Sequence, residues 1–197
     1  METGVRVDTV PPGIAIVATE LADARKLLGD ESLTWLSGKA VCMDLAVTHR
    51  RGDPFVVVDL QETGWAERYT AADGSLAPEG EELIQAQMPI RPGESPDAAA
   101  ARLERLLDAS YAGWRERETW QRRQVMDGRT GALDEPGKTW RDRPAIDRGD
   151  GVFIAGDMVA APGCLSEIAW ASAVEASRLA VAHARGHAAQ AAAPAAA

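Results

Sequence analysis

The sequence predicts a mixed α/β (α+β) fold in which two outer pieces share one sheet and an antiparallel lobe is inserted between them. Three observations support this prediction. A short buried strand followed by a helix occurs near each end of the chain, at 13–30 and 151–184. Each of these outer pieces is too small to form a sheet by itself. The intervening residues 38–90 contain strand-like segments separated by turn residues, which is typical of antiparallel strands.

The first outer piece consists of one strand and one helix. Residues 13–20, GIAIVATE, contain Ile14, Ile16 and Val17 among small residues, as in a strand of a parallel sheet that is buried on both faces. The next segment, LADARKLLGD, has apolar residues at helical spacing, and Gly29 is a suitable residue to end that helix.

The inserted lobe is predicted to contain three strands and a helix. GKAVCMDLAVTH and DPFVVVDLQ are strand-like, the RRGD between them is suited to a hairpin turn, and 80–90 follows a Gly/Pro-rich loop as a third strand. A helix then begins at Pro96, because Ser95 is a good cap and Asp97 lies at the positive end of the helix dipole. Its apolar stripe comprises Leu103, Leu106, Leu107 and Tyr111.

The rest of the chain leads to the second outer piece. Residues 112–125 are ambiguous between helix and strand, and 126–151 are rich in loop-forming residues. A strand is expected at 151–155 and a helix from about Ser166 to Ala184. The tail 187–197 has no side chain able to anchor it to a core, so we expect it to be disordered.

Composition excludes several classes of function. The formal net charge of -9 argues against binding to nucleic acid or to an anionic membrane. No apolar run is long enough for a membrane span, and the N-terminus has no signal-peptide core, so we expect a cytoplasmic protein. Cys42 and Cys164 lie far apart and form no CxxC, so neither a zinc site nor a disulfide framework is expected.

The strand-turn-helix at 151–184 contains the most informative polar residue. Asp157 follows Gly156 at the carboxyl end of a parallel-type strand, where open α/β sheets bind ligands. An ionised carboxylate only accepts hydrogen bonds, so its natural partner is a hydroxyl group such as that of ribose or ribityl. The helix that opens at Ser166 presents free backbone N–H groups, which favour an electron-rich carbonyl or an anionic ring. The alternative is that Asp157 only caps a turn and the small residues of the helix only pack.

The segment GVFIAGDMVAAPGCLSEIAWASAVEASRLA resembles the C-terminal flavin-binding signature of FAD-dependent oxidoreductases of the phytoene desaturase and flavin amine oxidase type. The resemblance implies that Gly156 and Asp157 lie against the ribityl and pyrophosphate of FAD, that the neighbouring Met158 is also a cofactor-binding residue, and that Leu165 and Ser166 lie near the flavin O2. GIAIVATE is similar to an earlier strand of that family, which places Ala18 and Thr19 beside the phosphates, although Glu20 replaces the usual proline.

The same resemblance implies a domain organisation. Residues 1–37 and 145–186 correspond to the C-terminal part of a Rossmann-like FAD-binding domain, and 38–144 to the antiparallel substrate lobe. The family's opening GxGxxG, which binds the ADP diphosphate, is absent: no three of the eighteen glycines have that spacing, and the GxG at Gly149 and Gly151 precedes a strand instead of following one. The chain is therefore similar to the C-terminal half of a flavoenzyme.

Two classes of function follow. In the first, the chain is a subunit or half of a split FAD-dependent oxidoreductase that transfers hydride from a substrate C–H or C–N bond to flavin. Its partner would be a GxGxxG-containing subunit, or it would form a homodimer, and its substrate would be small and apolar or aromatic. In the second, it is a cofactor-free binding or scaffolding module; a third reading is a decayed fragment unable to fold alone.

Other candidate residues are weaker, and the sequence assigns no catalytic residue and no metal site. His183 and His187 lie four residues apart, which is more typical of a solvated helix end than of a metal site. The six tryptophans are suited to an aromatic substrate pocket, but the favoured interpretation is that they are ordinary core and interface residues.

Overall fold

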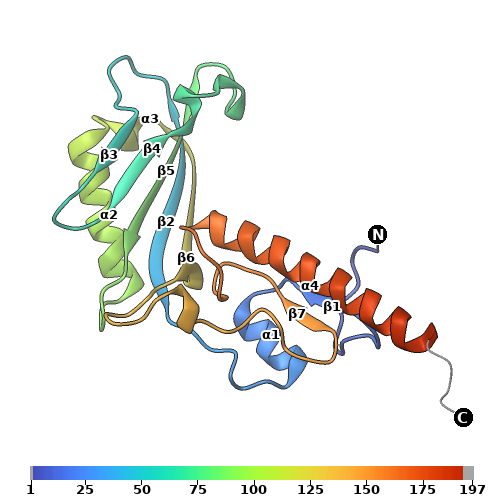
Figure 1. The fold of residues 1–197 in the computed structure, drawn as a ribbon. Coiled ribbons are helices and arrows are strands. Elements are labelled where there is room, and N and C mark those ends of the chain that lie inside the picture. Colours follow the sequence, from blue (N-terminus) through green and yellow to red (C-terminus); the bar gives the residue numbers. More distant parts are fainter. Residues whose placement is uncertain (1, 193–197) are drawn as a thin grey trace, which may run out of the picture. The chain divides into compact units, whose positions relative to one another are not determined.

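The computed structural model describes residues 2–192, with side chains through residue 187. It has one parallel and one antiparallel sheet, which confirms the predicted mixed α/β fold (Figure 1). The described residues divide into two compact units: an inserted unit, Gly38–Thr130, and an outer unit, which combines the residues before Gly38 with those after Thr130. This boundary at Thr130 differs from the end at residue 144 that the sequence predicts for the inserted lobe, and the assignment of the two parts to a cofactor domain and a substrate lobe stays a prediction.

The outer unit is built on two parallel strands. β1 (Ala15–Val17) pairs with β7 (Val152–Ile154) in the register Ala15↔Val152 to Val17↔Ile154. α1 (Leu21–Leu28) follows β1 and ends at Gly29, whose left-handed φ of 62° lets its N–H bond Arg25 O. α4 (Ser166–Ala192) packs against both strands through its buried side chains, among them Ile168, Ser172 and Ala176.

The inserted unit is a five-stranded sheet with one long helix. Its strands are β2 (Ser37–Thr48), β3 (Val56–Val58), β4 (Trp65–Arg68), β5 (Glu81–Pro89) and β6 (Glu118–Ala132), in the spatial order β3-β4-β5-β2-β6. Short 3₁₀ turns lie at Tyr69–Ala71 and Gly74–Leu76, and a third, in the outer unit, lies at Trp140–Asp142.

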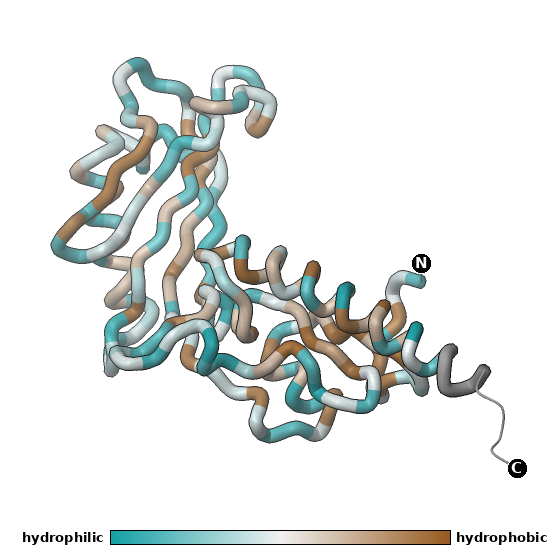
Figure 2. Tube along the Cα trace, viewed as in Figure 1, coloured by the Kyte–Doolittle hydropathy of each residue, from teal (hydrophilic) through white to brown (hydrophobic). Residues whose placement is uncertain are grey.

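α2 (Pro96–Ser110) covers one face of this sheet, and the short α3 (Trp114–Arg117) follows it. The helix begins as the sequence predicts, because Ser95 Oγ accepts from Ala98 N–H at 3.2 Å. Alternate residues of β2 and β5 pack against the buried stripe of α2, and Figure 2 shows hydrophobic residues along these strands. The predicted stripe residues Leu103, Leu106, Leu107 and Tyr111 are all buried.

Three local predictions are wrong. The RRGD at 50–53 does not join a hairpin, because β2 pairs with β5 and β3 pairs with β4. The strand β4 has no counterpart in the sequence analysis, since its four residues are too few to show a pattern. Residues 126–132 belong to β6 and are not a loop, because an edge strand with exposed side chains lacks the apolar alternation that marks most strands.

The expected disorder of 187–197 stays a prediction. α4 extends to Ala192, beyond the helix end expected near Ala184, and four of the six residues at 187–192 are alanines, which have high helix propensity. The remaining positions, 193–197, lie outside the described residues.

Candidate functional site

The parallel pairing of β1 and β7 brings two of the predicted segments to one sheet edge. Because Val17 is paired with Ile154, the residues that follow both strands leave the sheet together. The carbonyl oxygen of Thr19 lies 3.9 Å from the position that a Cβ on Gly156 would occupy. A small pocket of about 10 Å³, enough for a single water molecule, lies here beside Thr19, Gly156, Asp157 and Met158.

The Asp157 carboxylate is half-buried and makes no hydrogen bond or ion pair to any residue between 2 and 192. Its Oδ2 lies 3.7 Å from where a Cβ on Gly131 would stand, and Gly131 has a φ of 82° that favours glycine. Removing a carboxylate from water without a partner costs free energy unless a donor satisfies it. The arrangement therefore suits a ligand that supplies hydroxyl or N–H donors.

Ser172, on the buried face of α4, holds the residue next to Asp157. Its Oγ accepts from Gly156 N–H at 3.0 Å and lies 3.0 Å from Gly156 O and 2.9 Å from Ala169 O, so its single proton goes to one of these carbonyls. Because Ser172 is fully buried, this contact fixes the end of β7 against α4.

Ser172 is one of the small residues of this helix, and its hydrogen-bonding role was not predicted from the sequence. The available signal was its position: Ile168, Ser172 and Ala176 recur every four residues, so a hydroxyl on this stripe faces the core and needs a partner.

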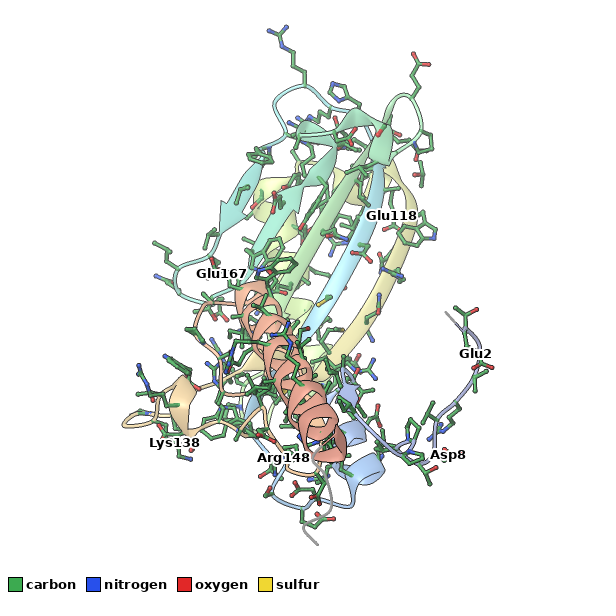
Figure 3. All side chains as sticks on the ribbon, turned by 45° about the vertical axis from the view of Figure 1, so that its right-hand side comes forward. Glu2, Asp8, Glu118, Lys138, Arg148 and Glu167 are labelled. Carbon is green, nitrogen blue, oxygen red and sulfur yellow. The ribbon has the colours of Figure 1, made fainter. Side chains whose placement is uncertain are left out.

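The start of α4 is a tightly specified turn. A Cβ on Gly163 would lie 2.8 Å from Glu167 Cβ, and the φ of 119° also requires glycine. The Glu167 carboxylate accepts from Cys164 N–H at 3.0 Å, and Figure 3 shows Glu167 at this end of the helix. Leu165 has a φ of 52°, which is rare for leucine, and its side chain is 72% exposed.

The predicted cofactor residues therefore form two groups. Ala18, Thr19, Gly156, Asp157 and Met158 meet at the carboxyl ends of β1 and β7, where Met158 is a buried core residue. Leu165 and Ser166 lie at the start of α4, and the Ser166 N–H makes no hydrogen bond to another described residue. No hydrogen bond between described residues links the two groups.

The other sequence candidates give no second polar site. The rings of His183 and His187 lie 4.5 Å apart, and no cluster of three metal-ligating side chains occurs in the described part of the chain. Cys42 and Cys164 are free thiols, and burial together with the charge of Asp44 raises the pKa of Cys42.

An apolar groove of about 570 Å³ lies in the outer unit between α4 and the segment 140–162. Trp140 and Trp170 line it together with Ile146, Pro162 and Val174, and Trp170 is 75% exposed. This volume is in the range of small-molecule sites.

Comparison with known proteins shows the fold. No known protein family matches the chain, and no curated protein is similar to it in sequence. Among solved structures, an oxidoreductase from Methanosarcina mazei superposes with a TM-score of 0.64 at 14% identity, over 84% of this chain and 42% of that protein. The chain shares its fold with part of an oxidoreductase.

A second solved structure also shares its fold with this chain over part of its length. A protein from Pyrococcus furiosus superposes with a TM-score of 0.56 at 21% identity, over 85% of this chain and 40% of that protein. The chain thus spans about two fifths of the length of both proteins. Within residues 2–192, no helix combines the length and apolar character needed to cross a membrane.

Proposed function

We propose that this chain is a subunit or half of a split FAD-dependent oxidoreductase of the phytoene desaturase and amine oxidase type, and that it supplies the flavin-ring side of the cofactor site. One observation carries the proposal: the half-buried Asp157 carboxylate, at the carboxyl end of a parallel strand pair, has no partner among the described residues. The fold shared with an oxidoreductase supports it.

Asp157 would accept a hydrogen bond from a ribityl hydroxyl of FAD. Because Gly156 has no Cβ, the cofactor would be able to lie close to the protein backbone at this residue. Ala18, Thr19 and Met158 would lie beside this arm of the cofactor. Leu165 and the open N–H of Ser166 would lie near the flavin O2, where the positive end of the α4 dipole favours developing negative charge. The flavin itself would accept the hydride from the substrate.

In this proposal the residues of this chain would contact the flavin side of the cofactor and not the ADP side. None of its glycines forms a GxGxxG, and the pocket of about 10 Å³ beside Asp157 is too small to enclose a flavin. The proposal therefore requires a GxGxxG-containing polypeptide to complete the site.

The test is FAD binding by the complex with that polypeptide, produced by co-expression with a neighbouring reading frame that has a GxGxxG. Asp157→Asn removes a charge-assisted hydrogen bond and is expected to weaken FAD binding about tenfold to a hundredfold. Asp150→Asn, at an exposed aspartate of the same unit, is the matched control and leaves binding unchanged. Equal FAD affinity for the two variants would count against the proposed role of Asp157.

The alternative function is a cofactor-free module that binds a small apolar or aromatic molecule. The observation that favours it is the apolar groove lined by Trp140 and Trp170. Titration with FAD separates the two functions, because a cofactor-free module does not bind FAD in any complex. A Trp170→Ala variant that loses an apolar ligand but keeps FAD binding assigns the groove to the substrate.

A further inference from the structure

We infer that the free edge of β3 is a dimerisation surface, on which β3 of a second copy of this chain pairs in the antiparallel direction. The surface belongs to the inserted unit, so the inference does not depend on the proposed function, whose candidate residues lie in the outer unit. β3 is one edge strand of the five-stranded sheet and β6 is the other (Figure 1). The two edges differ in the side chains that they expose.

The edge at β3 gathers exposed apolar side chains. Phe55, Val56, Val58 and Leu60 are all exposed, and Leu60 is 88% exposed. Figure 2 shows this strand as a hydrophobic segment of the sheet. Edge strands of soluble proteins usually carry a charged residue, a proline or a bulge that prevents pairing with another chain. β3 has none of these between Val56 and Val58, where its pairing with β4 is regular.

The opposite edge of the same sheet is polar. Residues 121–124 of β6 read QRRQ and are exposed. Arg122 donates to Asp44 at 2.5 Å, and Arg123 donates to Asp97 at 2.7 Å, so both charges are held on this strand. Charged side chains on an edge strand oppose pairing with another chain. The sheet is therefore protected at β6 and open at β3.

The backbone of β3 divides its hydrogen-bonding groups between β4 and the free edge. Phe55 O accepts from Arg68 N–H at 2.8 Å, and Asp59 N–H donates to Gly64 O at 2.8 Å. The backbone groups of alternate residues along an antiparallel strand face the same neighbour. Phe55, Val57 and Asp59 therefore face β4.

Val56 and Val58 consequently direct their N–H and C=O groups to the free edge. In the described part of the chain, β3 pairs with β4 alone. When two copies of β3 lie antiparallel with Val57 opposite Val57, Val56 of each copy lies opposite Val58 of the other. Opposed residues of this kind exchange both of their hydrogen bonds. This register therefore satisfies every outward group of Val56 and Val58 in both copies.

Symmetry and charge favour a second copy as the occupant. A twofold axis beside Val57, perpendicular to the sheet, relates the two strands and leaves no open edge at β3, so assembly ends at the dimer. Arg51 is exposed in the loop before β3, and Asp59 lies in the turn after it. Hydrogen bonds from backbone N–H groups of that turn lower the pKa of Asp59 and keep it ionised. Antiparallel pairing places the Arg51 end of each copy beside the Asp59 end of the other, where the charges attract.

The small size of the contact sets the expected affinity. β3 has three residues, and only the side chains around it add to the buried surface. Such a contact is smaller than the standard interface of about 1,600 Å². We therefore expect a weak dimer, with a Kd on the order of 10–100 μM.

Sedimentation velocity of the full-length chain, from about 1 to 500 μM, measures this dimer. Val58→Lys puts a charge on the edge and is expected to weaken dimerisation about tenfold or more. Leu76→Lys is the matched control, because it makes the same change of charge at an exposed leucine of the same unit away from β3, and it leaves the dimer unchanged. Circular dichroism confirms that each variant is folded.

Disulfide cross-linking tests the register in a Cys164→Ser background. Val57 lies opposite its own copy as a non-hydrogen-bonded pair, in which the two Cα atoms lie about 4.5 Å apart and a disulfide is able to form. Val58 lies opposite Val56 instead. Under mild oxidation, Val57→Cys is therefore expected to form the intermolecular disulfide about tenfold faster than Val58→Cys.

Hydrogen exchange tests the same surface without a substitution. From the lowest to the highest concentration, the Val56 and Val58 amides are expected to slow about threefold or more, whereas the Val57 amide, which faces β4, changes little. A chain that stays monomeric at every concentration, a dimer unaffected by Val58→Lys, or a dimer that leaves the Val56 and Val58 amides unprotected overturns the inference. Equal cross-linking of the two cysteine variants, or growth beyond a dimer, overturns the twofold antiparallel arrangement.

Discussion

The carboxylate of Asp157 and the hydroxyl of Ser172 occupy the same end of β7 but differ in what satisfies them. Ser172 completes its hydrogen bonds within the protein, whereas Asp157 has no protein partner among the described residues. A polar group that the protein satisfies stabilises the fold, and one that it leaves unsatisfied is available to a ligand. This difference separates the structural residue from the candidate binding residue.

Ser172→Ala is expected to destabilise the outer unit by about 1–3 kcal/mol, because the buried Gly156 N–H loses its acceptor. Urea unfolding measures this change. Ser177→Ala is the matched control on the same helix: its exposed hydroxyl donates to Ala173 O, and its loss is expected to cost less than about 0.5 kcal/mol. Similar midpoints for the two variants would show that Ser172 does not hold the end of β7.

The folding stability of the outer unit is expected to depend on pH through Asp30. Hydrogen bonds from Ser32, at 2.6 Å from its hydroxyl, and from Arg148 lower the pKa of Asp30 from 3.8 to about 2. Since the folded pKa lies below the unfolded one, this stabilisation is complete above pH 3.8 and is lost as the pH falls toward 2.

We therefore expect the Asp30→Asn variant to be less stable than the natural chain at neutral pH, with a difference that shrinks as the pH falls from 3.8 toward 2 and below. Thermal unfolding monitored at a series of pH values measures the difference. A stability difference that stays constant across this range would contradict the role of Asp30.

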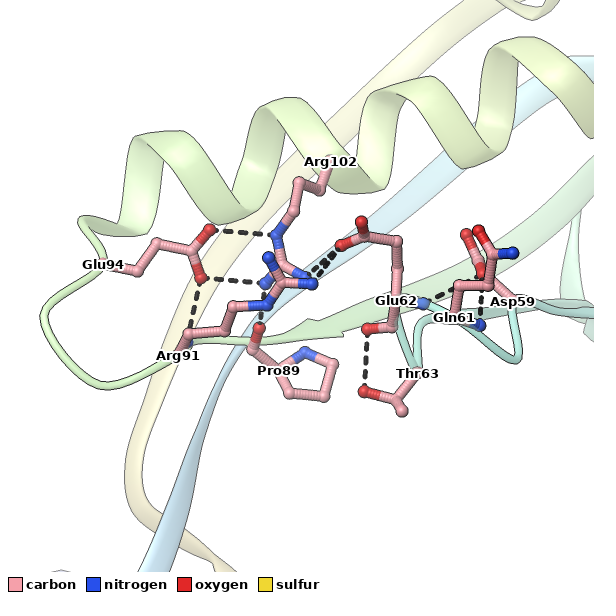
Figure 4. Close-up of polar contacts among 8 residues, drawn as sticks. All are labelled: Asp59, Gln61, Glu62, Thr63, Pro89, Arg91, Glu94 and Arg102. Carbon is pink, nitrogen blue, oxygen red and sulfur yellow. Dashed lines mark hydrogen bonds and ion pairs between the residues drawn. The ribbon is translucent and has the colours of Figure 1, made fainter.

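At the scale of elements, Arg102 joins α2 to two loops of the inserted unit. Its guanidinium donates from Nε to Glu94 Oε1 at 2.9 Å, from Nη1 to Glu62 Oε2 at 2.6 Å and from Nη2 to Pro89 O at 2.5 Å (Figure 4). Because Arg102 is only 6% exposed, its bonds are largely shielded from water.

Arg102→Met is expected to destabilise the inserted unit by about 3 kcal/mol, because two carboxylates lose their buried partner. Arg91→Met is the control: Arg91 also donates to Glu62, at 2.8 Å, but it is half-exposed, so its side chain is expected to contribute less than about 1 kcal/mol. Chemical denaturation compares the variants, and equal losses would contradict a special role for the buried arginine.

Elements with local signals were predictable from the sequence. The caps of α1 and α2 depend on Gly29 and on Ser95 with Pro96, which act within one turn. The pairing of β2 with β5 was not predictable, because it joins Thr48 to Glu81 across an intervening pair of strands. The sequence between β2 and β3 favoured a local hairpin, and the long-range pairing prevailed.

At the scale of the whole molecule, the hydrophobic core is divided in the same way as the chain. One buried cluster contains residues of β2, β4, β5 and α2, and the other contains residues of β1, α1, β7 and α4. The first cluster lies entirely within a continuous stretch of chain, whereas the second depends on segments from both sides of it.

Residues 38–130 are therefore expected to fold when expressed alone and to show a cooperative urea transition by circular dichroism. The matched fragment is the outer unit with its two segments joined by a short Gly/Ser linker, which is expected to be less stable because the edge of β1 is open. A fragment 38–130 without a cooperative transition would contradict the independence of its core.

The candidate site was predictable only in part. The position of Asp157 at the carboxyl end of a strand follows from the order of apolar and small residues before it. The closeness of Thr19 to Gly156 and the hydrogen bond between Gly156 and Ser172 could not be predicted from the sequence. Both depend on which strands pair and on which helix packs against them.

The most direct test of the whole account is the amount of flavin bound by the complex of this chain with a GxGxxG-containing partner. The account predicts a yellow complex that releases about one FAD per chain on denaturation, with binding weakened by Asp157→Asn and unchanged by Asp150→Asn. A colourless complex that takes up no FAD at any concentration would contradict it.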